Sequence, residues 1–279
     1  MATTTTGTAS PDLTAITARQ RGVWASGDYS AVAARIPVIS ELLCDAADLR
    51  AGDRVLDVAG GSGNTALAAA RLGARVTSLD YVPSLLGRAA ERAAAEGLAI
   101  DLVEGDAQAL PFPDASFDAV ISVVGVMFAP DQRRAAAELL RVVRPGGTIA
   151  LASWTPGGFI GGLLRTVGAH VPPPAGLAPP TLWGEEAHVR DLLGGGVREM
   201  RLRTRTYTFR FESPEGFTDF FRTHYGPTVA AFAALPEDGR DALAADMTAL
   251  ARRFDRLGGG GPVAIPADYL EVVAARSGG

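Results

Sequence analysis

The chain has 279 residues, of which 47% are hydrophobic, so it can bury a large core in one domain with an elaboration. Its formal net charge of −5 argues against a nucleic-acid ligand, which requires a basic face. The single cysteine, Cys44, cannot form an internal disulfide, and no apolar run approaches the length of a membrane span. We therefore expect a cytoplasmic protein that binds neither nucleic acid nor membrane.

The first fifty residues precede the regular part of the pattern. Met1–Ser10 is a Thr-rich tail that lacks the basic and apolar regions of a signal peptide. In the helical region that follows, Ser30 is expected to cap one helix and Pro37 to begin another. We assign residues 1–50 to a disordered tail and an N-terminal helical cap.

Strands and helices alternate between residues 51 and 153. The predicted strands are Arg54–Val58, Arg75–Leu79, Ile100–Glu104, Phe117–Val123 and Thr148–Ser153. The predicted helices are Gly63–Leu72, Pro83–Glu96 and Asp131–Val143. Continuously apolar strands that alternate with helices indicate an α/β fold, in which a parallel sheet is covered by helices on both faces.

The pattern changes after Trp154. A proline-rich connector at 171–180 leads into a short helix and a long β-rich run, Val197–Phe211. Further helices are predicted at Pro214–Tyr225, Thr228–Leu235 and Glu237–Leu257, and Tyr269–Ala274 is predicted as a closing strand. We assign residues 154–279 to inserted helices together with closing strands of the same sheet.

The segment from Val55 to Gly63 is the most informative part of the chain. A short apolar strand ends in Asp57 and breaks into a loop of small residues, after which a helix begins. Small side chains let a ligand approach backbone N–H groups at a helix N-terminus, where the partial positive charge favours a carboxylate or phosphate. This loop is therefore a predicted ligand site.

Carboxylates follow three successive predicted strands, at Asp57, Asp80 and Asp106. Ligands of parallel sheets bind at the carboxyl ends of the strands, where these side chains would gather. Asp80 suits the ribose of either an NAD-type or an adenosyl-type ligand. Asp57 would repel a pyrophosphate but would stabilise a cationic ammonium, which favours the adenosyl ligand over NAD.

In the order of the chain, further motifs accompany these carboxylates. They are Ser78-Leu79-Asp80, Gly105-Asp106-Ala107 with Leu110-Pro111-Phe112, Phe117-Asp118-Ala119-Val120, and Leu140 to Gly147. Together with Val55–Gly63, this set resembles the class I S-adenosylmethionine-dependent methyltransferases, in the small-molecule group that includes quinone C-methyltransferases. The resemblance covers residues 50–153 and implies a doubly wound Rossmann-like, mostly parallel seven-stranded sheet with N-terminal helices and a helical lid insertion.

The resemblance also implies a cofactor, S-adenosyl-L-methionine, and the residues that bind it. Gly61 and Gly63 would approach the methionine part, with Ala59 in place of the family's first glycine and Val123 nearby. Asp80 would bind the ribose hydroxyls with Tyr81 beside the adenine, and Asp106 and the Ala107 N–H would read the adenine edge. Asp57 completes this cofactor-binding set.

The methyl acceptor is expected to be an apolar or aromatic small molecule. Large side chains outside the cofactor loops are predicted to bind it: Tyr29, Phe128, Trp154, Phe159, Trp183, Phe221 and Tyr225. Positioning supplies most of the rate in such a transfer, so a catalytic base is not obligatory. If a base is used, His224 is the candidate, since an imidazole titrates near neutral pH.

Other functions and ligands remain open at this level. The same fold could bind the cofactor without transferring a methyl group, and an NAD(P)-dependent oxidoreductase would also explain the glycine loop and Asp80. No cluster of His, Cys, Asp or Glu has the spacing of metal ligands, so no metal is expected. The pattern leaves open whether the chain forms a homodimer.

Overall fold

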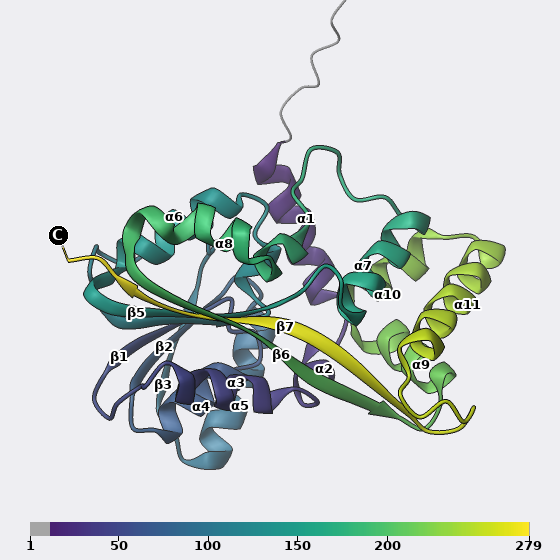
Figure 1. Cartoon of the computed structure of the whole chain (residues 1–279), viewed down its shortest axis with the longest axis horizontal. Helices are drawn as coiled ribbons and strands as arrows, with labels where there is room; N and C mark the ends of the chain where they lie inside the picture. The colour runs from purple at the N-terminus through teal and green to yellow at the C-terminus, as the bar shows by residue number, and fades with distance from the viewer. Residues whose placement is uncertain (1–11, 279) are drawn as a thin grey trace, which may run out of the picture.

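A computed structural model describes residues 12–278 of the chain; the tail predicted at Met1–Ser10 lies outside the described residues. Seven strands form one sheet in the order β3-β2-β1-β4-β5-β7-β6 (Figure 1). The strands are β1 (Arg54–Val58), β2 (Arg75–Asp80), β3 (Ile100–Glu104), β4 (Phe117–Val123), β5 (Val143–Trp154), β6 (Val197–Phe211) and β7 (Val263–Arg276). Strands β1 to β5 are parallel, whereas β7 runs antiparallel to both of its neighbours. The predicted α/β fold with a mostly parallel seven-stranded sheet is confirmed.

Helices cover both faces of the sheet (Figure 1). The N-terminal helices are α1 (Leu13–Ala25), α2 (Tyr29–Ala33) and α3 (Pro37–Ala46), and the crossover helices are α4 (Asn64–Arg71), α5 (Pro83–Glu96) and α6 (Gln132–Val142). The later helices are α7 (Phe159–His170), α8 (Glu186–Leu193), α9 (Pro214–His224), α10 (Gly226–Ala234) and α11 (Glu237–Phe254). Short 3-10 turns lie at Val126–Phe128, Pro180–Gly184 and Gly194–Gly196. No described helix has both the length and the apolar character needed to cross a bilayer.

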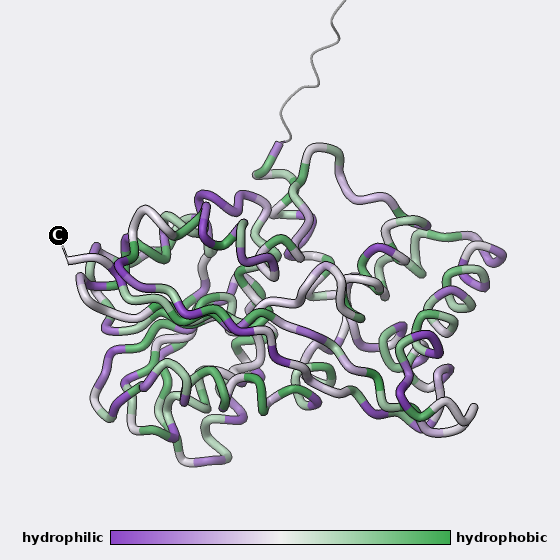
Figure 2. Tube along the Cα trace, in the orientation of Figure 1, coloured by the Kyte–Doolittle hydropathy of each residue, from purple (hydrophilic) through white to green (hydrophobic). Residues whose placement is uncertain are grey.

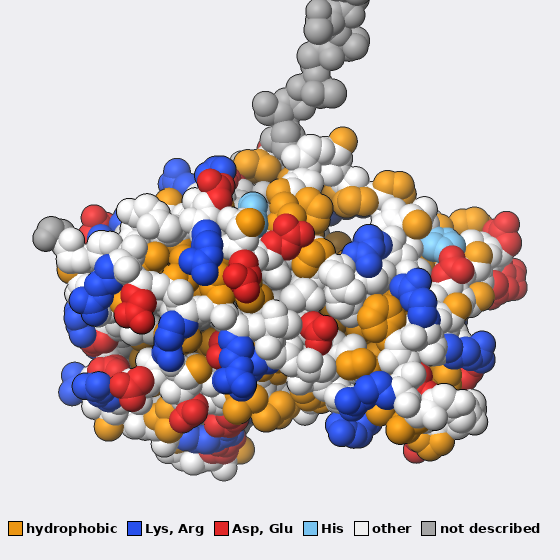
Figure 3. Space-filling view, in the orientation of Figure 1, with side chains coloured by type: hydrophobic (Ala, Val, Ile, Leu, Met, Phe, Trp, Pro, Cys, Tyr) orange, Lys and Arg blue, Asp and Glu red, His pale blue; other side chains and the backbone are white. Residues whose placement is uncertain are grey.

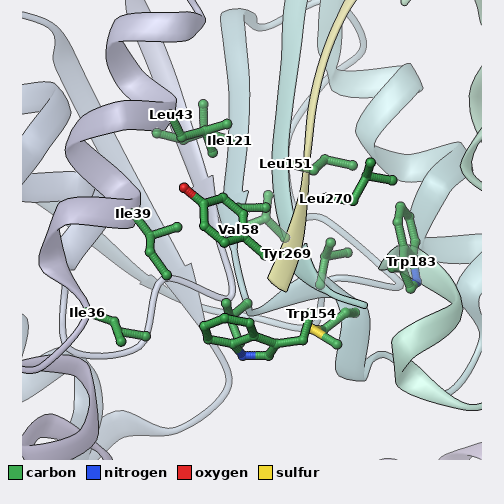
Figure 4. Packing of buried hydrophobic residues seen from close by; sticks show 14 of the residues in the cluster. Ile36, Ile39, Leu43, Val58, Ile121, Leu151, Trp154, Trp183, Tyr269 and Leu270 are labelled. Carbon is green, nitrogen blue, oxygen red and sulfur yellow. The ribbon is translucent and has the colours of Figure 1, made fainter. Parts of the chain in front are cut away.

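The core of the molecule lies along the central strands. Val55, Leu56 and Val58 of β1 are fully buried, as expected for a strand with helices on both sides. The hydropathy trace shows the same distribution, with hydrophobic segments concentrated in the sheet (Figure 2). Tyr269 of β7 lies on the side of the sheet toward Ile39 and Leu43 of α3, whereas Leu151 and Leu270 lie on the opposite side, toward Trp183 (Figure 4).

Strands β6 and β7 extend beyond the rest of the sheet. Their pairing runs from Val197 opposite Arg276 to Phe211 opposite Val263, whereas β5 pairs with β7 only between Thr148 and Trp154. The projecting part carries α7, α9, α10 and α11, which form a helical layer at one end of the molecule (Figure 1). This layer and the N-terminal helices lie beside the carboxyl ends of the parallel strands.

Several local predictions differ from the structure, and strand β5 begins at Val143 instead of Thr148. The cap of α2 is Asp28, whose carboxylate accepts from the Ser30 N–H at 3.1 Å, so the expected cap at Ser30 is wrong. Strand β7 is longer than Tyr269–Ala274, because its pairing with β6 recruits residues 263–268 that lack a strand pattern of their own. Helix α7 has no counterpart among the predicted elements, since its three glycines lower its intrinsic helix propensity.

Candidate active site

A cavity opens at the carboxyl ends of the parallel strands, under α1 and α2. Side chains and backbone from the loops after β1, β2, β3 and β4 form its floor, and N-terminal helices form its opposite wall. The predicted residues on its wall are Tyr29, Ala59, Gly61, Asp80, Tyr81, Ala107, Val123 and Phe128. This is the edge of a parallel sheet where ligands bind.

The loop after β1 presents bare backbone to this cavity. Gly61 has a φ of +55° and Gly63, which precedes the first turn of α4, has a φ of +87°. A side chain on Gly63 would lie 2.9 Å from the Ala89 Cβ, so glycine lets α4 pack closely on α5. Gly61 lines the cavity, whereas Gly63 lies outside the cavity wall, against Ala89 of α5.

Asp80 anchors the loop to the end of β2. Its Oδ2 accepts from the Gly61 N–H at 2.9 Å, and its Oδ1 accepts from the Val82 N–H at 2.8 Å. Burial raises the pKa of this carboxyl, although the backbone N–H groups oppose the effect. Each oxygen keeps a further lone pair, so Asp80 can accept from a ligand hydroxyl in the cavity.

Asp57 lies beneath the loop and not on the cavity wall. Its Oδ2 accepts from the Ala66 N–H at 3.0 Å in the first turn of α4, and its Oδ1 is buried without a hydrogen-bond partner. Burial raises the pKa of Asp57 to about 7, the Ala66 N–H opposes this, and the Asp80 carboxylate adds to it. Asp57 therefore acts on a bound ligand through its charge and through the loop, not by direct contact.

Two strained residues face each other across the floor of the cavity. Ala59 has a φ of +54°, and Val124, directly after β4, has the same value, in a region that β-branched residues rarely adopt. A side chain on Gly125 would meet the Ala59 carbonyl oxygen at 2.4 Å. Strain held at a cavity in this way is characteristic of functional sites. Val124 and Gly125 line the cavity and were not among the predicted residues, because their backbone conformation has no local sequence signal.

The segment after β3 brings only part of its motif to the wall. Gly105 and Ala107 line the cavity, whereas Asp106 lies beside it, engaged by Gln108. The Gln108 N–H donates to Asp106 Oδ1 at 2.9 Å, and the Gln108 side-chain amide contacts both carboxylate oxygens. Gln108 was not predicted as a site residue, since a polar side chain after a strand carries no distinguishing pattern.

Aromatic side chains form another part of the cavity wall. Trp24 packs edge-on against Tyr29, with ring centroids 5.5 Å apart, and against Phe128 at 4.8 Å. Tyr225 approaches the far side of Trp24 at 5.6 Å but does not line the cavity. Burial, with a contribution from the Asp80 carboxylate, raises the pKa of Tyr29, so its hydroxyl stays protonated at neutral pH.

Four other residues predicted to bind the acceptor lie in the hydrophobic core. Trp154, Phe159, Trp183 and Phe221 are each at most 3% exposed, and none of them lines the cavity. Trp154, Phe159 and Phe221 pack around Phe209 of β6, with ring centroids 6.0, 6.5 and 6.0 Å from it. Trp183 is buried in the 3-10 turn Pro180–Gly184, which packs on β5. The structure therefore assigns these four side chains to packing.

His224 also lies away from the cavity. It ends α9, where its ring packs against Phe220 with centroids 4.8 Å apart, and it is not among the residues of the cavity wall. Within residues 12–278 no three His, Cys, Asp or Glu side chains gather as a metal site would require. The titratable side chains on the wall are Asp80 and the tyrosines Tyr29 and Tyr81.

The polar groups of the cavity wall fit an adenosyl ligand that carries an amino group. The Asp80 carboxylate can accept hydrogen bonds, and the bare backbone of the Gly60–Ser62 segment allows a ligand to approach closely. The buried Asp57 carboxyl, when ionised, adds a favourable field for a cation. The Ser62 hydroxyl is buried without a partner beside this loop. The residues present therefore match the donors and acceptors of S-adenosylmethionine.

Comparisons with known proteins agree with this geometry. A family described as "Methyltransferase domain" matches residues 56–151. An uncharacterized protein of Mycobacterium tuberculosis is 46% identical over 235 residues, which cover 83% of this chain and 85% of the relative. The chain carries the methyltransferase domain of the class I S-adenosylmethionine-dependent methyltransferases. Its cofactor is S-adenosylmethionine.

Two further proteins resemble this methyltransferase, one over part of its sequence and one in its fold. The demethylmenaquinone methyltransferase of Thermus thermophilus is 37% identical over 142 residues, covering 46% of this chain and 64% of that protein. The crystal structure of the YcgJ protein of Bacillus subtilis superposes with a TM-score of 0.59 over 87% of this chain and all of that one, at 19% identity. At this identity the structural likeness shows the shared fold.

Proposed function

We propose that this methyltransferase methylates an apolar or aromatic small molecule that binds against Trp24, Tyr29 and Phe128. The observation that carries the proposal is the composition of the cavity wall. It combines a single carboxylate and bare backbone with three aromatic rings, in which Trp24 packs edge-on against both Tyr29 and Phe128. Pockets lined by aromatic side chains with few polar groups bind apolar ligands. The demethylmenaquinone methyltransferase among the relatives supports an acceptor of this class.

The cofactor contacts are proposed from the same geometry. Asp80 would accept from the ribose hydroxyls with Tyr81 beside the adenine, since both residues line the cavity. Asp106 and the Ala107 N–H would bind the adenine edge. The loop of Ala59, Gly61 and Gly63, with Val123 opposite, would hold the methionine part above the charge of Asp57.

The chain contributes mainly binding, orientation and the exclusion of water. The cofactor supplies a methyl group on a positively charged sulfur, which needs no further activation. Trp24, Tyr29 and Phe128 would hold the acceptor in line with this methyl group and keep water from the site, which accounts for most of the rate in a displacement of this kind. Tyr29, protonated at neutral pH, can donate a hydrogen bond to an acceptor oxygen.

The surface agrees with a small-molecule acceptor. On the face in Figure 3, arginine side chains are interspersed with aspartate and glutamate and form no continuous basic area. Polymers such as nucleic acids need such an area to meet their phosphates. This face therefore offers nothing that favours a polyanionic substrate over a small molecule in the cavity.

The test combines binding with an acceptor screen. Calorimetry with S-adenosylhomocysteine, run beside NADH, should show micromolar binding of the first ligand only. Incubation with labelled S-adenosylmethionine and matched acceptors, naphthoquinols against polar amines such as glycine, should then label the naphthoquinol class. A Phe128→Ala variant should lose labelling while it keeps its S-adenosylhomocysteine affinity. Cofactor binding without labelling of any acceptor would instead favour a protein that binds the cofactor without transfer.

A further inference from the structure

Gln108 joins three separate parts of the molecule through its side-chain amide. Its Nε2 donates to Thr17 Oγ1 on α1 at 3.1 Å and to both oxygens of Asp106, at 3.1 and 3.0 Å. Its Oε1 accepts from the N–H of Asp131, the residue that caps α6, at 2.8 Å. Both hydrogens and the carbonyl oxygen of the amide are therefore in use.

The N-terminal part of helix α1, which carries Thr17, is held lightly against the rest of the molecule. None of its residues is fully buried, although Trp24 at its end lines the cavity. Besides the Thr17 contact, its polar tie to the parallel half of the sheet is an ion pair between Arg21 and Glu104, whose side chains are about half exposed. Exposed pairs of this kind contribute little stability. The C-terminal part of α1 packs on α10 and, through Trp24, on Phe128 and Tyr225, so only the N-terminal part that carries Thr17 can open with little loss of packing. Helix α1 crosses between the sheet and the helical layer (Figure 1).

We propose that Gln108 is a positioning residue that couples adenine binding at Asp106 to the closure of α1 over the cavity. This inference rests on the adenine contact in the proposed function. The Gln108 amide bridges both oxygens of Asp106 and fixes the plane of the carboxylate, while it leaves lone pairs for an exocyclic amine. Thr17 holds the Gln108 amide only when α1 is closed.

The coupling is reciprocal. When α1 is closed, Thr17 orients Gln108, and Gln108 orients the Asp106 carboxylate. The entropy cost of ordering these two side chains is then already met before adenine binds. Because linkage between two binding events acts equally in both directions, adenine bound at Asp106 holds α1 closed. A ligand with the same ribose and amino acid but without the exocyclic amine lacks this effect.

The experiment measures amide hydrogen exchange of α1. Wild-type protein is compared free, saturated with S-adenosylhomocysteine, and saturated with S-inosylhomocysteine, in which an oxo group replaces the exocyclic amine. Saturation is set by calorimetry, which also gives both affinities. We expect S-adenosylhomocysteine to slow exchange in α1 at least about fivefold more than the inosyl analogue, the lower end of typical coupling between sites.

Three variants separate coupling from simple tethering. Thr17→Val is nearly isosteric and removes the acceptor on α1, so it should abolish the difference between the two ligands in α1 while S-adenosylhomocysteine still binds. Gln108→Ala should abolish the same difference and also weaken S-adenosylhomocysteine about fivefold or more. Arg21→Ala is the matched control, because it removes the ion pair between α1 and Glu104 without changing Asp106. It should keep the difference in α1 exchange between the two ligands.

The outcomes distinguish this inference from the proposed function. Equal slowing of α1 by both ligands in the wild type, or a full ligand difference in Thr17→Val, would overturn the coupling and leave the cofactor site intact. Failure of wild-type protein to bind S-adenosylhomocysteine at all would refute both the proposed adenine contact and the coupling that depends on it.

Discussion

Replacing Asp57 with asparagine removes a charge from the interior of the fold. The side chain is fully buried, one oxygen accepts from the Ala66 N–H at 3.0 Å, and the other has no partner. Burial is the main cause that raises the pKa of Asp57 from its ordinary value of 3.8 to about 7. An asparagine can keep the contact to Ala66 without an ionised group beneath the loop.

The size of the effect follows from the two pKa values. Between pH 3.8 and about 7, the native state keeps the Asp57 carboxyl protonated, whereas the unfolded chain has released this proton. The contribution of Asp57 to the free energy of unfolding is therefore fully present below pH 3.8 and is lost as pH rises through about 7. At 1.36 kcal/mol for each pH unit of this interval, the wild type should lose about 4 kcal/mol relative to Asp57→Asn.

Urea unfolding at several pH values from about 4.5 to about 8 measures this difference, because all other titrating groups are shared by the two proteins. The free energy of unfolding of the wild type should fall relative to that of Asp57→Asn across this range. Asp101→Asn changes an exposed aspartate on β3 and should run parallel to the wild type. Parallel curves for the wild type and Asp57→Asn would refute the reasoning.

The remaining predictions concern the cavity. Affinity for S-adenosylmethionine should rise with pH through about 7 in the wild type but not in Asp57→Asn, because the ionised carboxylate favours the ligand ammonium; calorimetry at pH values on either side of that pKa checks this. Asp80→Ala should weaken S-adenosylhomocysteine at least about tenfold by calorimetry, since each charge-assisted hydrogen bond contributes roughly 1.5–3 kcal/mol, and unchanged affinity would remove Asp80 from the site. Gly125→Ala should lower stability by roughly 1–3 kcal/mol in thermal unfolding, because its Cβ would meet the Ala59 carbonyl oxygen at 2.4 Å, whereas Gly87→Ala on α5, with open space around it, should not destabilise. His224→Gln should retain turnover, because the ring packs on Phe220 away from the cavity; a large fall in turnover with intact cofactor affinity would restore the base assignment.

The parallel half of the fold was predictable because its signals are local. Helix α5 and strands β3 and β4 have the predicted bounds, since apolar runs, a proline at the start of the helix and turn residues mark each of them. Parallel topology then brings all strand ends to one edge. Asp80, Gly61 and Ala107 therefore meet on one cavity wall, as the sequence alone indicated.

The choice among aromatic residues required the tertiary structure. Tyr29 and Phe128 line the cavity, but Phe159 and Trp183, which have the same character in the sequence, are buried in the core away from it. Composition records that a side chain is large and apolar, while its neighbours depend on which surfaces meet after folding. The length of β7 has the same origin, because pairing with a strand about fifty residues earlier defines it.

The sequence by itself thus determined the fold class, the cofactor loop and the order of the carboxylates along the sheet edge. Only the tertiary structure decided that Asp57 lies under the loop, that Gln108 joins α1 to Asp106, and that His224 packs on Phe220 outside the cavity wall. The reason is physical: backbone preferences and hydrophobic periodicity act between neighbours in the chain, whereas burial and side-chain hydrogen bonds arise between segments that only the folded packing brings together.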